Sequence, residues 1–276
     1  MILMQWSKLF AHRVFFQDKA LQDLKRDHMF IDMHTHTGYS HDSNTRVSSL
    51  LRTAKKEGIG LAVTDHLQVK GALEACKDRK VFVIPGIEIA AKENKEILLY
   101  FYSIKDLLDF HQKNIERRLT THEYKHARFR NTIKSLKCTT PMIELLEQAD
   151  EYNCVKCIPH PFSYLLRNSH KFFSQKDGKM KLIDAIEVVN STMSPSRNKK
   201  AAKWGMKQKK AFTAGSDAHT AKELGKAMTA TRASNIEEFL ERIREKQGIL
   251  LGKEMSRREA INHIIRLGLV KREKME

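Results

Sequence analysis

The feature that most constrains this chain of 276 residues is a short apolar run that recurs seven times. Each run is rich in β-branched or other apolar residues, and most of the runs end abruptly in polar residues. The seven runs are Met29–Thr35, Ile59–His66, Val81–Ile89, Glu96–Ser103, Val155–Pro161, Asp184–Asn190 and Ala211–Ser216. Runs of this length and composition predict buried β-strands.

Segments with helical character separate most of these runs. Val47–Glu57 carries apolar residues at helical spacing and is followed by Gly58, a residue type that commonly ends helices. Met142–Glu151 follows Pro141, which suits the start of a helix. Alternating strands and helices predict a parallel sheet, and seven strands with polar residues at one end suggest a barrel whose site lies at the C-terminal rim.

Three segments fall outside this alternation. We expect residues 1–28 to form an N-terminal helical extension, residues 105–137 a helical insertion after the fourth strand, and residues 253–276 a basic C-terminal helix. The barrel itself would then span residues 29–252. Charge-rich helices of this kind either pack on a domain or present solvated faces, so the sequence leaves their role open.

Charge and hydropathy narrow the setting of the protein. No stretch has the roughly 18 consecutive apolar residues that a membrane span requires, and the apolar N-terminus is interrupted by polar residues, unlike a secretory signal. We therefore expect a cytoplasmic protein. Lys and Arg number 50 against 33 Asp and Glu, a formal net charge of +17 at pH 7. This excess favours anionic partners, either nucleic acid, phosphorylated metabolites or acidic membrane surfaces.

Metal-capable side chains stand at the ends of five of the seven runs. His34 and His36 are two residues apart at the end of the first run, so both imidazoles would lie on one face of a strand. Asp217 and His219 repeat this spacing after the last run. The eight candidate metal ligands are His34, His36, Asp42, His66, Glu88, His160, Asp217 and His219.

This ligand set indicates a hydrolytic metal centre. Mixed imidazole and carboxylate ligands favour zinc, manganese or iron(II) over calcium or magnesium. Eight groups exceed the four that one structural zinc uses, so at least two ions are expected, with Glu88 as the best-placed bridge. Two such ions acidify a bound water and clamp a phosphate ester, and we expect Glu88, Asp217 and His219 to be the catalytic residues.

Residues beside the ligands are candidates for supporting roles. Arg197 and Lys70 would bind the substrate phosphate, because a guanidinium fork or an ammonium near the rim suits a terminal phosphate. Asp32 and Asp65 would orient imidazole rings by accepting their second N–H, although both are also compatible with ordinary acids at strand ends.

One basic segment stands apart from the ligands. Lys199, Lys200, Lys203, Lys207, Lys209 and Lys210 form a run without an acid. Such a run would track a phosphate backbone or form a solvated helix face. Trp204 is the only aromatic residue within it, which weakens the case for a surface that stacks single-stranded bases.

In their order along the chain, these motifs resemble the PHP family, the polymerase and histidinol phosphatase family. The resemblance rests on Asp-x-His-x-His-Thr-x-x-Ser from Asp32, the following Asp42, Thr-Asp-His at 64–66, Gly-Ile-Glu at 86–88, His-Pro at 160–161 and Ser-Asp-Ala-His at 216–219. The chain is more similar to the branch of stand-alone phosphoesterases than to the branch embedded in polymerases. The resemblance implies a distorted (β/α)7 barrel with a trinuclear site. Because one ligand of the third ion is missing here, we expect two or three divalent transition-metal ions.

The resemblance also implies how the ligands are shared. One ion would be held by His34, His36, Glu88 and Asp217, a second by Asp42, His66 and His219, and a third by Glu88 and His160. Many members carry a further histidine on the fourth strand. That strand is Glu96-Ile97-Leu98-Leu99-Tyr100 here, and a leucine is expected at the histidine position. The third ion would then be weak, absent or completed by water, or a histidine of the inserted stretch (His111, His122 or His126) would substitute.

The expected activity is metal-dependent hydrolysis of a phosphate ester by a metal-activated hydroxide. The substrate would be a phosphomonoester, a nucleotide or a nucleic-acid end. Two alternatives remain open at this point. One is a small-molecule phosphatase similar to histidinol phosphatase, and the other is a non-catalytic nucleic-acid-binding module with a relict metal site. The sequence leaves the oligomeric state unknown.

Overall fold

A computed structural model describes residues 27–125, 132–163, 168–175 and 178–252, together with residues 14–15, 263, 270 and 274. For 14–15, 121–125 and 132–135 it describes the backbone alone. Most of the expected N-terminal extension (1–28) and C-terminal helix (253–276) therefore lies outside the described residues. Within the extension, Val14–Phe15 forms a short strand, β1, rather than part of a helix.

The seven predicted runs all form strands of one sheet. They are β2 (Met29–Thr35), β3 (Gly60–Val63), β4 (Val83–Ala90), β5 (Glu96–Phe101), β8 (Cys154–Ile158), β9 (Ala185–Asn190) and β10 (Ala211–Gly215). They are hydrogen-bonded neighbours in this order. Their burial is nearly complete along their length, which explains why the sequence shows continuous apolar runs rather than alternation.

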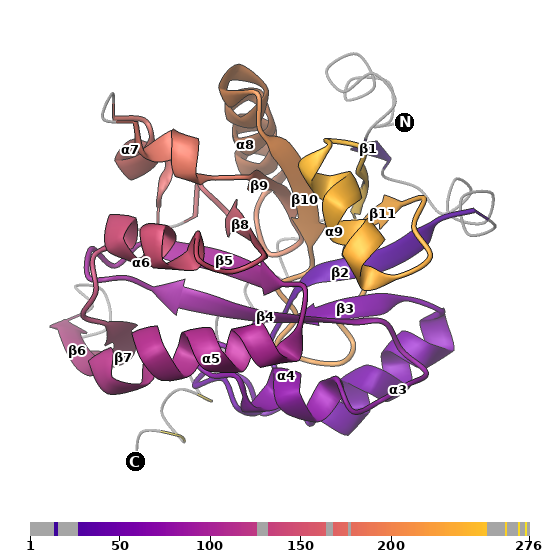
Figure 1. Cartoon of the computed structure of the whole chain (residues 1–276), viewed down its shortest axis with the longest axis horizontal. Helices are drawn as coiled ribbons and strands as arrows, with labels where there is room; N and C mark the ends of the chain where they lie inside the picture. The colour runs from indigo at the N-terminus through magenta and orange to yellow at the C-terminus, as the bar shows by residue number, and fades with distance from the viewer. Residues whose placement is uncertain are drawn as a thin grey trace.

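The sheet curls into a distorted barrel (Figure 1). Ala218, just after β10, forms a parallel bridge with Thr35 at the end of β2, and the His36 N–H donates to the Ala218 carbonyl at 2.8 Å. The first half of β2 instead pairs with β11 (Ala227–Thr231), which continues antiparallel to β12 (Ile249–Gly252). Because β11 pairs with the first half of β2, strands β2 and β10 meet only at the rim. The barrel is therefore distorted.

Among the seven predicted strands, the expectation of a parallel sheet is wrong at one. β5 runs antiparallel to both of its neighbours, β4 and β8. Only residues 91–95 separate β4 from β5, which is too short for the crossover that a parallel pair requires. In consequence β5 presents its first residue, Glu96, to the rim at which the other strands end.

Helices pack against the outer face of the sheet. In Figure 1, α3 (Val47–Glu57), α4 (Lys70–Ala75) and α5 (Ile104–Asn114) line one side of the molecule, and α8 (Pro195–Gln208) lies on the opposite side. Shorter helices are α6 (Met142–Ala149) and α7 (His170–Phe173), with 3₁₀ turns η1 (Glu116–Arg118) and η3 (Lys179–Leu182). As predicted, α3 ends at Gly58, whose φ of 65° suits glycine, and α6 begins after Pro141.

The inside of the barrel is a separate apolar cluster. It contains inward-facing strand residues such as Met33, Ile84 and Leu98. α9 (Ile236–Arg244) adds Phe239 and Ile243, which are fully buried and pack with residues at the starts of β2, β9 and β10. α9 therefore closes the end of the barrel opposite the rim.

The insertion at 105–137 is helical only in its first part. α5 and η1 occupy residues 104–118, but β6 (Leu119–Lys125) and β7 (Thr132–Cys138) form an antiparallel hairpin. Threonine, isoleucine and tyrosine in these two stretches favour strand over helix, and the abundance of charge concealed this signal. Across the described residues, no helix is long and apolar enough to cross a membrane.

Candidate metal centre

The end of β2 places two imidazoles at the rim. His34 and His36 are both fully buried, and their ring centroids lie 5.0 Å apart. Oδ1 of Asp217, which follows β10, lies 3.3 Å from Nε2 of His36 and 3.7 Å from Nε2 of His34. These three residues offer ligand atoms that all lie within 4.8 Å of one another, a spacing that one metal ion can bridge.

A second group surrounds Asp42, in the loop after β2. Oδ2 of Asp42 lies 3.2 Å from Nε2 of His66, and Oδ1 lies 3.3 Å from Nε2 of His219. The ring of His36 stacks on His66 and His219, with centroid distances of 4.6 and 4.4 Å. All four residues are buried, and together they form the largest of the potential ligand groups among the described residues.

Glu88, on β4, connects the groups. Its Oε2 lies 3.2 Å from Nε2 of His34, 3.4 Å from Nε2 of His36 and 3.2 Å from Nδ1 of His66. Its Oε1 lies 3.3 Å from Nε2 of His160, which follows β8. A carboxylate whose two oxygens face different imidazoles has the geometry of a bridging ligand. The structure thus brings together all eight residues proposed as ligands from the sequence.

The fourth strand supplies a glutamate to this region, and the expectation of a leucine there was wrong. Leu98 is in register with Glu88 but belongs to the apolar interior. Two residues earlier on the same face, Glu96 is 2% exposed, and its Oε2 lies 3.8 Å from Nε2 of His160. Glu96 also groups with His66 and Glu88 as a potential ligand. The expectation assumed a parallel β5, whose C-terminal end would lie at the rim. Because β5 is antiparallel, its N-terminal end lies there instead.

Of the three histidines proposed as substitute ligands, only His111 is described with its side chain, and it does not join the cluster. Nε2 of His111, on α5, lies 3.2 Å from the Leu67 carbonyl oxygen, and His111 is in none of the ligand groups. The side chain of His122 and the whole of His126 lie outside the described residues.

Glu187, on β9, is a further residue that the sequence reasoning missed. Its Oε1 lies 3.0 Å from Nδ1 of His34, and its Oε2 accepts hydrogen bonds from the backbone N–H of His160 at 2.8 Å and from Nδ2 of Asn190 at 3.0 Å. A buried carboxylate that accepts the second N–H of an imidazole fixes the tautomer and orientation of the ring. The available signal was an acid in the middle of the buried strand Ala185–Asn190.

Asp32 and Asp65 do not orient imidazole rings in this structure. Asp32 accepts hydrogen bonds from the backbone N–H groups of His34, Ser216 and Gly225. Asp65 accepts from the N–H and the hydroxyl of Thr37, both at 2.6 Å. Burial raises the pKa of each carboxyl to about 6, although these hydrogen bonds oppose the shift. Both acids therefore fix the loops that carry the ligand candidates.

Burial and opposite charges shift the pKa values of the clustered groups. Burial lowers the pKa of His160, but the hydrogen bond to Glu88 and its charge outweigh this effect and raise the pKa to about 9. Burial likewise opposes the charge of Asp42 at His219, whose pKa rises to about 9. Burial raises the pKa of Glu88, yet the charges of His66 and His34 hold it well below its usual value. Cations at this rim would replace protons on the imidazoles.

Two of the clustered residues have an uncommon backbone conformation. His160 has a φ of 25° and Asp217 a φ of 55°, and Leu67, directly after His66, has a φ of 56°. Non-glycine residues in this region typically cost about 1–3 kcal/mol each, and such residues gather at functional sites. Their concentration here indicates that the surrounding structure holds these side chains in place.

The two candidate phosphate-binding cations differ in their surroundings. Arg197, in the first turn of α8, donates from Nη1 to the carbonyl of Phe162, two residues after His160. Lys70 is exposed at the start of α4. A third residue near the rim is His41, whose ring lies 4.8 Å from that of His66 and whose Nε2 is 3.9 Å from Oδ2 of Asp42. The sequence reasoning did not single out His41.

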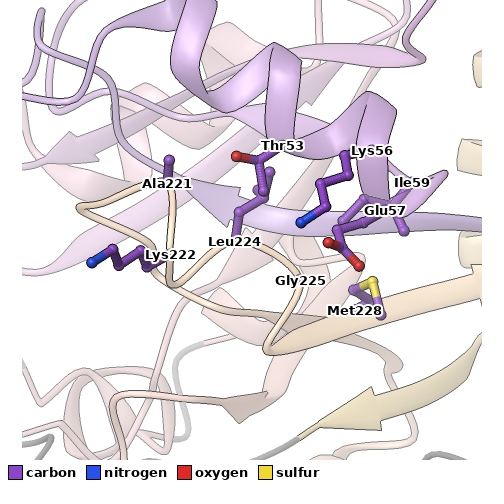
Figure 2. Close-up of a pocket in the computed structure, with 9 residues that line it drawn as sticks. All are labelled: Thr53, Lys56, Glu57, Ile59, Ala221, Lys222, Leu224, Gly225 and Met228. Carbon is purple, nitrogen blue, oxygen red and sulfur yellow. The ribbon is translucent and has the colours of Figure 1, made fainter.

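A pocket of about 440 Å³ lies next to this region, between α3 and the loop that follows His219 (Figure 2). Its lining includes the apolar side chains of Ile59, Leu224 and Met228 and the cations Lys56 and Lys222. None of the eight clustered residues lines it. The pocket is therefore separate from the rim cluster.

Comparisons with known proteins identify the family. A family model described as PHP domain matches residues 32–171, about half of the chain, and a second model described as PHP-associated matches residues 195–247. The chain belongs to the PHP family. The matched region contains six of the eight clustered residues of this PHP protein, and Asp217 and His219 lie within the PHP-associated match.

The chain is also similar to individual proteins and solved structures. An uncharacterised protein of Methanocaldococcus jannaschii is 25% identical over 212 residues, which cover 76% of this chain and 73% of the relative. The structure of PsfC from Pseudomonas syringae matches with a TM-score of 0.59 at 15% identity, over 90% of this chain and 99% of that one.

Endonuclease Q from Pyrococcus furiosus matches with a TM-score of 0.59 at 20% identity. The match covers 79% of this chain but 56% of endonuclease Q. At these identities the solved structures show that the fold is shared.

Proposed function

We propose that this PHP protein is a metal-dependent phosphoesterase. The observation that carries the proposal is the convergence at one rim of eight His, Asp and Glu side chains that are far apart in the sequence. Nε2 of His36 and Nε2 of His219 are buried there, and each lies 3.3 Å from a carboxylate oxygen without making a hydrogen bond to a described residue. Buried polar atoms normally have partners, so these two fit donors to a metal ion.

Two or three transition ions fit the ligand groups. His34, His36, Glu88 and Asp217 would hold one ion, and Asp42, His66 and His219 a second. Glu88, His160 and Glu96 would hold the third, with Glu96 in place of the histidine that the family often has. Zinc, manganese and iron(II) suit this mixture of imidazoles and carboxylates.

The residues of the chain have separable tasks in this proposal. When bound, the ions acidify a water and neutralise charge on a phosphate ester. Glu187 fixes the ring of His34, and Asp32 and Asp65 hold the neighbouring loops. Arg197 and Lys70 would bind phosphate oxygens from the two sides of the rim.

For the substrate we propose a nucleotide or the end of a nucleic acid. The formal charge of +17 favours an anionic substrate, and nucleotides and nucleic-acid ends carry several negative charges. A structural relative, endonuclease Q, has been solved with a 27-mer duplex substrate that carries an abasic lesion at its active site; it matches this chain with a TM-score of 0.61 at 17% identity, over 60% of its own length.

The proposal is tested by metal analysis together with a phosphatase screen. The purified protein should hold two or three transition ions and hydrolyse a chromogenic phosphate ester, nucleotides or end-phosphorylated oligonucleotides with manganese added. Asp217→Ala should lower turnover on the order of 10²–10³-fold, because it removes a carboxylate proposed to bind a metal ion that stabilises charge at the reacting centre. Circular dichroism should show that the variant stays folded. A folded wild-type protein that binds no metal would contradict the proposal.

A further inference from the structure

A second pocket lies at the other end of the barrel. It has a volume of about 580 Å³ and is lined by residues just before β8, β9 and β10 and at the end of α9. Cys154, at the start of β8, is in its lining, whereas His160 lies six residues further along. At roughly 3.3 Å per strand residue, the pocket is about 20 Å from the metal centre. It is therefore a different site.

Cations dominate the lining of this pocket, which includes only two acids, Asp150 and Asp184. The six cations are Lys156, Lys181, Lys209, Lys210, Arg244 and Lys246. Lys156 is paired with Asp150, and Arg244 donates to the Cys154 carbonyl at 2.6 Å. The opposing acids thus neutralise only part of the positive charge.

Four of the six cations make no ion pair with any residue that the structure describes. They are Lys181, Lys209, Lys246 and Lys210, whose Nζ donates to the Ile183 carbonyl instead. Burial lowers the pKa of Lys156 and of Lys210. The charge of Asp184 opposes both shifts, whereas neighbouring cations add to them: Arg244 at Lys156, and Lys246 at Lys210. Like charges so placed repel one another unless an anion lies among them.

The backbone gives an independent indication. Lys209 and Lys246 follow the ends of α8 and α9 with φ values of 54° and 62°. Glycine or asparagine is the usual residue in this left-handed conformation, and a lysine there is strained. Two separate helices thus end in a strained lysine, and both lysines line the same pocket. Glycine would fit the backbone better at both positions, so the presence of lysine indicates that the two side chains have a function.

We propose that this pocket binds a phosphate-bearing anion, at a site distinct from the metal centre. The pocket includes Lys209 and Lys210, the last two members of the acid-free lysine run in the sequence. The anion is a phosphorylated small molecule or a phosphate of a nucleic-acid backbone. Both sources present the same oxygens to lysine and arginine donors.

The test compares two pairs of substitutions that remove equal charge. Lys209→Gly with Lys246→Gly removes two pocket cations and also relieves the backbone at both positions, so its melting temperature should not fall. Lys200→Gln with Lys203→Gln removes two exposed lysines of α8 outside the pocket. Calorimetric titration with tripolyphosphate should show binding about tenfold weaker in the pocket variant, with the control variant close to wild type.

A third variant protects the test against a folding failure. Lys181→Gln with Lys246→Gln leaves the end of α8 unchanged and should weaken tripolyphosphate binding by a similar factor. Equal weakening in the pocket and control variants, or none in either, would overturn the proposal, since net charge alone or no site would then explain the data.

The source of the anion is decided with a labelled single-stranded oligonucleotide in the same three variants. If its affinity falls only in the two pocket variants and decreases steeply with salt, the pocket binds a nucleic-acid backbone. If tripolyphosphate alone discriminates the variants, the ligand is a small phosphorylated molecule. Either result supports the anion site.

Discussion

The two ends of the barrel bury opposite kinds of atoms. At the rim, imidazoles and carboxylates such as His36 and Glu88 lie buried against one another. At the other end, α9 inserts Phe239, Leu240 and Ile243 into the apolar interior, and each is fully buried. The strands are common to both ends, so one set of strands provides stability at one end and a polar site at the other.

This difference explains how the folded chain can contain a site that lowers its stability. Buried polar atoms without partners reduce stability, whereas a buried aromatic side chain contributes several kcal/mol. A well-packed end can therefore support a rim whose stability depends on bound ions. The predictions that follow test whether the two ends are in fact independent, beginning with the largest expected effect.

Removing the aromatic side chain that α9 inserts into the apolar end should cost the most stability. We expect Phe239→Ala to lower the free energy of unfolding by about 3–5 kcal/mol, because it leaves a cavity in the barrel interior. Urea unfolding measures the change, and Leu73→Ala on the exposed face of α4 is the control. The number of ions per folded molecule should not change. A parallel loss of metal would show that the two ends are coupled.

Metal removal should destabilise the rim. Dialysis against a chelator should lower the melting temperature, since ions that bind only the folded state add about 2.7 kcal/mol at 100 times their dissociation constant. Adding manganese or zinc should restore it. The same treatment should affect Asp217→Ala less, because that variant lacks a ligand candidate. An unchanged melting temperature in the wild type would mean that the rim holds no ion tightly.

Glu187 offers a smaller and more specific effect. Glu187→Gln keeps the size of the side chain but weakens the acceptor for Nδ1 of His34. We expect metal affinity to fall about 10–100-fold, as for other carboxylates behind a metal-binding imidazole. Competition with a chelating dye measures the affinity, and Glu147→Gln on the surface of α6 is the matched control. Equal affinities in the two variants would argue against this role.

The smallest expected change is at Glu96. Glu96→Gln should reduce the metal content by about one ion per chain and leave the other ions bound, because only the third group uses this carboxylate. Elemental analysis of the folded variant provides the measurement, again with Glu147→Gln beside it. If the full number of ions remains, Glu96 has a structural role only.

Much of the architecture could be predicted from local patterns. Each strand is an apolar run, because a strand covered on both faces has to be apolar along its whole length. The ends of α3 and α6 followed from Gly58 and Pro141, whose backbone preferences act within a few residues. The eight clustered residues were found because strand ends of one barrel meet at one rim.

Other features depended on contacts between distant segments. Glu187 belongs to the site because β9 lies across the barrel from His34, a distance in sequence of 153 residues. Gly215 shows the same limit, since a Cβ atom there would lie 2.4 Å from Cβ of His34. Neither the Glu187–His34 contact nor the Gly215–His34 contact produces a periodic pattern in the sequence.

By itself, the sequence determined the seven strands, their order along the chain and the ligand candidates at their ends. Only the tertiary structure decided the direction of β5, and with it the placement of Glu96 rather than a leucine at the rim. The tertiary structure also decided that Asp32 and Asp65 accept hydrogen bonds from backbone N–H groups and that β6 and β7 pair as a hairpin. The physical reason is that burial patterns and turn residues act locally, whereas strand direction and hydrogen-bond partners depend on which segments meet in space.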